Sequence, residues 1–357
     1  MNSLIKNIKS LTVEHIRRSS NRRRAVNIME VCGTHTMAIA SSGIKSLLPK
    51  EINLISGPGC PVCVTPVGVI DSAIELSRKG HIITTFGDMI RVPGSNSSLE
   101  KEKSKGNSVK IVYSAADALS VAKNNPKKEV VFVGVGFETT SPTIAAAIKM
   151  AEKEKIRNFS VIPAFKLIPP AIKKILEQKS VKINGFLLPG HVSAIIGSKP
   201  YRFISEKFGI PCAIAGFEST DILEGILSIL KQIKSKKPKI EIQYKNVVRP
   251  QGNPFATKLL YSVFTESDSS WRGIGLIRNS GLKLRKNYEK YDALKKFGVR
   301  IKDVKEPAGC LCGKVLTGTA KPRQCKYFGK KCTPETPIGP CMVSSEGTCA
   351  ALYKYGN

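Results

Sequence analysis

The sequence predicts an α/β fold, and two observations support this prediction. The first is that, between about residues 26 and 230, short apolar runs of strand type alternate with turns and helical patterns. For example, "EVVFVGV" is followed by "GFETTS" and then by the helical "PTIAAAIKMAEKEK". Strands that alternate with helices are typical of βαβ units, which form parallel sheets covered by helices on both faces.

The second observation is a similarity between two of these units. Residues 135–148 read "VGFETTSPTIAAAI" and residues 215–227 read "AGFESTDILEGIL", so both contain a strand, a G-F-E-[TS]-T turn and a helix. This similarity predicts two similar α/β/α domains whose parallel-type sheets face a cleft. We place an N-terminal helical segment at 1–25, the first α/β domain at 26–150, the second at 151–240 and a Cys-rich C-terminal domain at 241–357.

The composition limits the classes of function. The formal net charge is +30, but the basic residues are scattered, and only Arg22–Arg24 form a compact cluster. The chain has no arginine-rich recognition helix and no aromatic stacking repeat, which argues against nucleic-acid binding and leaves an acidic protein partner as the better explanation. No apolar run is long enough to cross a bilayer, and the N-terminus lacks a signal peptide, so we expect a cytoplasmic protein without membrane contact. In a reducing compartment, the ten cysteines are expected to be metal ligands or redox thiols.

Five polar motifs each follow a predicted strand: CGTHT, GPGCPVC, GFETT, PGHVS and GFEST. In parallel sheets this places them at the carboxyl ends of the strands, where α/β proteins bind ligands. Cys32 in CGTHT should lie near a helix N-terminus, where the helix dipole favours the thiolate form. His35 is then a candidate second ligand, proton carrier or hydrogen-bond partner of the turn. The alternative for Cys32 is an ordinary small buried residue.

The C-x-x-C motif of Cys60 and Cys63 has three interpretations. A zinc half-site needs a second pair of ligands, and no matching pair lies nearby in the sequence. A redox dithiol of thioredoxin type opens a helix after a strand, as "INLIS" before this motif suggests, and its disulfide is easily made and broken. The third interpretation is a structural turn. The redox dithiol is our leading hypothesis.

Other strand-end residues are weaker candidates. Glu138 and Glu218 could act as a general base or an anchor, but a glutamate in this position also commonly caps a helix. His191 in PGHVS lies at the same predicted edge, whereas Cys212 in the apolar "IPCAIAG" is expected to belong to the core.

The last fifty residues are rich in Gly, Pro and Cys and have few long apolar runs, so they need a stabilising element other than a hydrophobic core. An iron–sulfur cluster or zinc would supply it, and a [4Fe–4S] cluster would use four cysteines of the six. Spacing alone does not choose among them. The six are Cys310, Cys312, Cys325, Cys332, Cys341 and Cys349.

Taken together, "EVCGTHT", "GPGCPVC", "VGFETT", "LLPGHVS", "WRGIGLIRNSGL", "KYFGKKCTPETPIGPCMVSSEG" and "CAALYKY" resemble the HypD family of [NiFe]-hydrogenase maturation proteins. The resemblance extends from about residue 28 to residue 355. It implies a scaffold with two similar α/β domains and a third domain that carries a [4Fe–4S] cluster, in surroundings like those of ferredoxin:thioredoxin reductase. It also implies an assembly protein with redox-active thiols rather than a turnover enzyme.

The resemblance further implies roles for individual residues. Cys32 would bind the iron of an Fe(CN)2CO unit together with a small HypC-type chaperone, and His35 would assist. A HypE-type partner would deliver cyanide, and Cys60 and Cys63 would alternate between dithiol and disulfide. The family's cluster spacing selects Cys310, Cys325, Cys332 and Cys349, with Cys312 as an alternate ligand and Cys341 unassigned.

A rival interpretation is a stand-alone iron–sulfur thiol–disulfide oxidoreductase. Such a reductase has no need for the additional CGTHT and GFETT motifs. A basic nucleic-acid-binding protein with a structural zinc is a third and weaker possibility.

Overall fold

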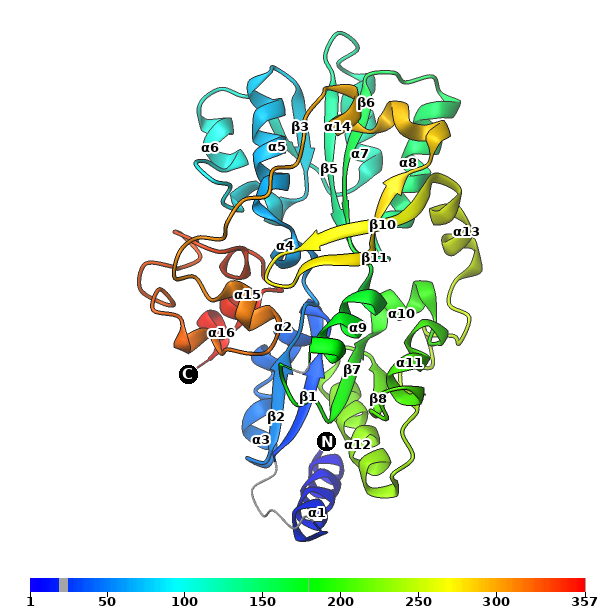
Figure 1. The fold of residues 1–357 in the computed structure, drawn as a ribbon, viewed down its shortest axis with the longest axis vertical. Helices are drawn as coiled ribbons and strands as arrows, with labels where there is room; N and C mark the ends of the chain where they lie inside the picture. The colour runs from blue at the N-terminus through cyan, green and yellow to red at the C-terminus, as the bar shows by residue number, and fades with distance from the viewer. Residues whose placement is uncertain (19–24, 179, 357) are drawn as a thin grey trace.

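The computed structural model describes residues 1–18, 25–178 and 180–356, and the basic cluster Arg22–Arg24 lies outside them. Its main part is α/β, with two parallel sheets, as predicted (Figure 1). A five-stranded sheet has the order β2-β1-β7-β8-β9, and a four-stranded sheet has the order β4-β3-β5-β6.

The five-stranded sheet consists of β1 (Val26–Glu30), β2 (Ile52–Ser56), β7 (Gly185–Pro189), β8 (Cys212–Ala215) and β9 (Ile240–Ile242). Its helices are α1 (Asn2–Arg18), α2 (Gly33–Ser41), α3 (Ile44–Leu47), α10 (Gly190–Ile196), α11 (Arg202–Glu206) and α12 (Ser219–Ser235), with the 3-10 turn η2 (Lys199–Tyr201). Helix α1 occupies the predicted N-terminal helical segment and packs against α12.

The four-stranded sheet consists of β3 (Ile82–Thr85), β4 (Val109–Ile111), β5 (Val130–Gly136) and β6 (Phe159–Phe165). Around it lie α5 (Val67–Arg78), η1 (Gly87–Arg91), α6 (Leu99–Ser104), α7 (Ala115–Lys123) and α8 (Ser141–Lys153). Helix α9 (Ile168–Gln178) connects β6 to β7 and lies beside β7 and α10 (Figure 1). Every residue of β5 is buried, as expected for a parallel strand covered on both faces.

The sheets divide the chain differently from the expected boundaries of 26–150 and 151–240. Strand β1 pairs in parallel with both β2 and β7, so residues 26–56 share a sheet with residues 185–242. Residues 82–165 form the other sheet, and β6 belongs to it. The alternation of strands and helices along the sequence shows where strands occur, but pairing between distant strands depends on which buried surfaces fit together.

The carboxyl ends of both sheets point toward the middle of the molecule, where the short helix α4 (Pro61–Val64) lies (Figure 1). This region was predicted as a cleft. Apolar side chains from both edges, including Val31, Val135 and Phe137, join one hydrophobic cluster there, so these edges are packed together.

The C-terminal part begins with α13 (Pro254–Val263) and a long antiparallel hairpin of β10 (Phe264–Trp271) and β11 (Gly275–Leu284). Short elements follow: η3 (Lys286–Tyr291), α14 (Ala293–Lys296), α15 (Cys312–Leu316), η4 (Pro322–Gln324), η5 (Pro340–Met342) and α16 (Thr348–Tyr355). Helix α16 packs against α2, which brings the Cys-rich end beside the CGTHT motif (Figure 1).

Candidate functional site

Cys32 ends the segment after β1 and is the N-cap residue of α2, as predicted. Its backbone N–H donates a hydrogen bond to Glu30 Oε2 (3.0 Å), and its carbonyl oxygen accepts one from the Thr36 N–H (3.0 Å). The expectation that the helix dipole favours the thiolate is wrong for the free thiol. Burial raises the pKa of Cys32 to about 12, and the carboxylates of Glu346 and Glu30 also raise it. The free side chain is therefore a neutral thiol at neutral pH.

The GPGCPVC loop packs directly against Cys32. The Gly33 N–H donates to the Gly59 carbonyl oxygen (2.8 Å), and a Cβ atom at Gly59 would collide with the backbone nitrogen of Cys32. Cys60 is the N-cap residue of α4, and the sulfur atoms of Cys60 and Cys63 lie at disulfide-bonding distance, with their Cα atoms 5.3 Å apart. Two predicted cysteine motifs from adjacent strands thus meet in one place.

His35 lies on the first turn of α2 and is fully buried. Its Nε2 donates to the Gly216 carbonyl oxygen (2.9 Å), and burial lowers the pKa of the ring to about 4. The ring is therefore neutral, and its Nδ1 atom has no hydrogen-bond partner among the described residues. A neutral imidazole with a free nitrogen lone pair can accept a proton or bind a metal ion.

His191 lies on the same sheet edge as His35, but Phe217 lies between them. The ring of Phe217 stacks on His191 at a centroid distance of 4.0 Å and contacts His35 at 4.9 Å. Burial lowers the pKa of His191 as well. The structure thus places both predicted histidines against the ring of Phe217, with His191 stacked and His35 tilted.

Glu138 and Glu218 have different environments despite their similar motifs. Glu138 is buried after β5, its Oε1 accepts the Ile168 N–H (3.0 Å), and its Oε2 has no partner among the described residues. Burial raises its pKa to about 8. Glu218 is exposed at the N-cap of α12, where its backbone N–H donates to Asp221 Oδ2 (3.3 Å). The capping interpretation therefore fits Glu218.

All six C-terminal cysteines line one small cavity together with Val315, Phe328 and Met342. Within the cavity, Sγ of Cys312 lies 2.7 Å from Sγ of Cys341, so these two sulfurs form a close pair. Burial, together with the neighbouring cysteines, raises the pKa of Cys310 to about 12. Over the described ranges, no three cysteine, histidine or acidic side chains are already arranged around a metal position.

Helix α4 connects the two groups of cysteines. It packs against α15 and η5, and Sγ of Cys63 lies 4.0 Å from the carbonyl oxygen of Pro340, the residue before Cys341. Cys212 lies apart in β8 and is fully buried, as expected for a core residue. The loop that holds Cys60 and Cys63 therefore contacts both the Cys32 segment and the elements around the cavity cysteines.

The sequence profile described as "HypD: Hydrogenase formation hypA family" matches residues 7–356. The chain belongs to this family. Similar proteins include the hydrogenase maturation factors HypD of Rhodobacter capsulatus, 46% identical over 93% of this chain and 90% of that protein, and of Escherichia coli, 43% identical over 96% and 94%. HypD2 of Bradyrhizobium diazoefficiens is 45% identical over 96% and 92%. The resemblance inferred from the sequence motifs is confirmed.

Two positions in this HypD-family chain were not predicted as site residues. Glu346 reaches the CGTHT turn from the C-terminal part, and its Oε1 accepts a hydrogen bond from Thr34 Oγ1 (2.8 Å). Arg272 at the hairpin tip is buried, and its Nε donates to the carbonyl oxygen of Thr65 (2.9 Å), just after α4. Both residues lie in segments that resemble the family ("SSEG" and "WRGIG"), but only tertiary contacts show what they support.

Cys341 is a third residue without a predicted role, and the structure pairs its sulfur atom with that of Cys312 in the cavity. Among the described residues of this family member, no helix has the length and apolar character needed to span a membrane.

Proposed function

We propose that this chain is a hydrogenase maturation factor that serves as the scaffold on which an Fe(CN)2CO unit is assembled. Its relatives in Rhodobacter capsulatus and Escherichia coli are named hydrogenase maturation factors. The observation that supports the scaffold most strongly is the buried arrangement of Cys32 beside the Cys60–Cys63 pair, with the free Nδ1 of His35 on the same helix turn. In this proposal the iron is cargo, and the Cys32 thiol loses its proton when it binds this iron.

The Cys32 proton would be released to the solvent, as is usual when a metal ion binds a thiol. The imidazole of His35 would assist as a neutral lone-pair donor, because a pKa of about 4 makes the ring a weak base. Its Nε2–H is held by the Gly216 carbonyl oxygen, so the unpartnered Nδ1 carries this lone pair. Glu138 and His191 would contribute to the same edge, as a buried neutral acid and as a stacked imidazole. We propose that a small HypC-type chaperone supplies a further ligand and that a HypE-type partner delivers cyanide.

The C-terminal cavity is the proposed site of a resident [4Fe–4S] cluster, and its all-cysteine donor set fits that group. By the spacing that the family resemblance implies, the four cluster ligands would be Cys310, Cys325, Cys332 and Cys349, with Cys312 as the alternate. Cys312 and Cys341 line the same cavity, with their sulfur atoms close together. When bound, such a cluster supplies single electrons. Two electrons and two protons would reduce the Cys60–Cys63 disulfide to two thiols.

The stand-alone thiol–disulfide oxidoreductase is the second candidate, and the Cys60–Cys63 pair is the feature that favours it. Such an enzyme must present a sulfur atom to the disulfide of its substrate protein. However, Cys60 is 3% exposed and Cys63 is 0% exposed. This burial supports an internal redox role for the pair and therefore the scaffold.

The proposal is tested by infrared spectroscopy of the chain co-purified without oxygen with a HypC-type chaperone. We expect bands of iron-bound cyanide and carbon monoxide in the natural sequence and their loss in Cys32→Ala. The matched control is Cys212→Ala, which also removes a buried thiol but one in β8. Bands that persist in Cys32→Ala, or that disappear equally in Cys212→Ala, would contradict the assignment of Cys32.

A further inference from the structure

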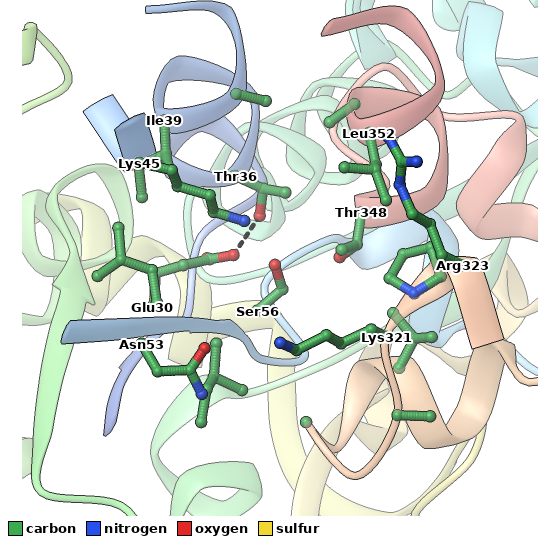
Figure 2. A pocket seen from close by; sticks show the side chains of 18 of the residues that line it. Glu30, Thr36, Ile39, Lys45, Asn53, Ser56, Lys321, Arg323, Thr348 and Leu352 are labelled. Atoms are coloured by element: carbon green, nitrogen blue, oxygen red, sulfur yellow. Dashed lines mark hydrogen bonds between the residues drawn. The ribbon is translucent and has the colours of Figure 1, made fainter. Parts of the chain in front are cut away.

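A separate cavity lies between the edge strand β2, helices α2 and α3, and the C-terminal elements α15, η4 and α16 (Figure 2). Its volume is about 360 Å³, which is within the range of small-molecule sites. These lining elements place the cavity at the junction between the five-stranded sheet and the Cys-rich part. The scaffold function proposed above does not use it.

Three cationic side chains line this cavity: Lys45 in α3, and Lys321 and Arg323 at η4. Figure 2 shows the amines of Lys45 and Lys321 pointing into the same space from opposite sides. None of the three forms an ion pair within the described part of the chain. The charges of Lys45 and Lys321 oppose each other, a cost that an anion in the cavity would remove.

The one acidic residue in the lining does not neutralise these cations by direct pairing. Glu30 accepts hydrogen bonds from the Thr36 hydroxyl and from the Cys32 N–H, so its two carboxylate oxygens are already used. Its side chain is buried in the cavity wall and points toward Thr36 (Figure 2). Three cations thus face one carboxylate, and the excess charge of the cavity is positive.

The remaining wall is largely apolar. Ile39 and Leu48 contribute from one side, and Val315 and Leu352 from the C-terminal side. Apolar walls with a few convergent polar groups are typical of sites for small organic ligands, in which the polar groups fix orientation. An inorganic ion alone would leave this wall without a partner.

We propose that this cavity binds a small organic anion, with its acidic group between Lys45 and Lys321 and its apolar body against Ile39, Leu48 and Leu352. A carboxylate and a phosphate monoester share this chemistry. Because Glu30 also holds the Cys32 backbone, the bound anion would lie next to the segment that positions this cysteine.

The experiment is calorimetric titration of the full chain with phenyl phosphate, with inorganic phosphate and phenol as the matched charged and apolar halves. We expect 1:1 binding of phenyl phosphate that is at least ~10-fold tighter than that of either half. A comparison with benzoate distinguishes a phosphate from a carboxylate ligand. Loss of a charge-assisted hydrogen bond in Lys321→Gln or Lys45→Gln should weaken binding ~10-fold.

The control variant is Lys50→Gln, which removes one exposed positive charge outside the cavity lining. It should leave the affinity unchanged, and circular dichroism checks that all variants fold alike. Equal affinity for phenyl phosphate and inorganic phosphate would overturn the proposed site. Equal weakening in Lys50→Gln and Lys321→Gln would show a general effect of the net charge and would also overturn it.

Discussion

At the scale of single residues, burial determines the protonation states in this site. Helix dipoles favour a thiolate at an N-cap, but desolvation outweighs this effect at Cys32 and raises its pKa to about 12. Burial likewise keeps His35 neutral, with a pKa of about 4, and raises the pKa of Glu138 to about 8. The site therefore contains neutral acids and a neutral base, which a buried pocket tolerates better than charges.

The raised pKa of Glu138 predicts a pH-dependent stability. Between about pH 4.5 and pH 8, the folded state holds a proton on Glu138 that the unfolded state has released, so stability falls as pH rises through this window. Glu138→Gln has no such proton. We expect its melting temperature relative to that of the natural sequence to rise by several degrees from pH 5 to pH 8.

Thermal denaturation followed by circular dichroism measures this difference. Glu218→Gln is the matched control because the side chain of Glu218 is exposed in the related motif. Its relative melting temperature should stay nearly constant with pH. A flat difference for Glu138→Gln would mean that this carboxyl is ionised in the folded protein.

At the scale of elements, two loops that follow neighbouring strands depend on each other. The loop after β2 approaches the Cys32 segment so closely that only a glycine fits at position 59. The Gly33–Gly59 hydrogen bond fixes this approach. The distance between the Cys60–Cys63 pair and Cys32 is thus set by backbone packing.

Gly59→Ala should separate these two loops. The added methyl group meets backbone atoms of Val31 and Cys32, which cannot rotate away, so we expect a loss of about 1–3 kcal/mol of stability. Denaturant unfolding measures the loss. Gly87→Ala is the control, because its Cβ would make only an ordinary contact with Ile111 Cγ2 at 3.9 Å. Equal stability of the two variants would show that the loops are not held against each other.

At the scale of the whole molecule, the Cys-rich end depends on the rest of the fold. Its elements are short and contact α2 and α4, and Glu346 joins it to the CGTHT turn. The hairpin tip at Arg272 adds a third connection through Thr65. A change in the C-terminal part is therefore expected to alter the geometry around Cys32 and Cys60.

If the cavity lined by the six cysteines holds a [4Fe–4S] cluster, substitution of a ligand cysteine should lower the iron content, whereas substitution of another cysteine should not. Cys325→Ser should lose most of the ~4 iron atoms per chain expected for such a cluster. The same change at Cys341 should retain them, because Cys341 lines the same cavity but lies outside the proposed ligand set. Iron analysis and visible absorbance of anaerobically purified protein measure both. Full iron content in Cys325→Ser, or its loss in Cys341→Ser alone, would contradict the ligand assignment.

Much of the fold and of the site could be predicted from local sequence patterns. The strand-end positions of Cys32, Cys60, Glu138 and His191 were predicted because each polar motif follows an apolar run, and strand and helix periods are local properties. The pairing of β1 with β7 could not be predicted in this way. Residues 28 and 185 are far apart in the chain, and they become neighbours only because the folded molecule buries their surfaces together.

The sequence by itself determined the α/β class, the HypD family and the cysteines available for chemistry, because motifs and hydrophobic periodicity depend only on residues close together in the chain. Only the tertiary structure decided the neutral state of Cys32, the contact of Glu346 with Thr34 and the pairing of Cys312 with Cys341. These depend on desolvation and on distances between residues far apart in the chain. Both are consequences of how the whole molecule packs.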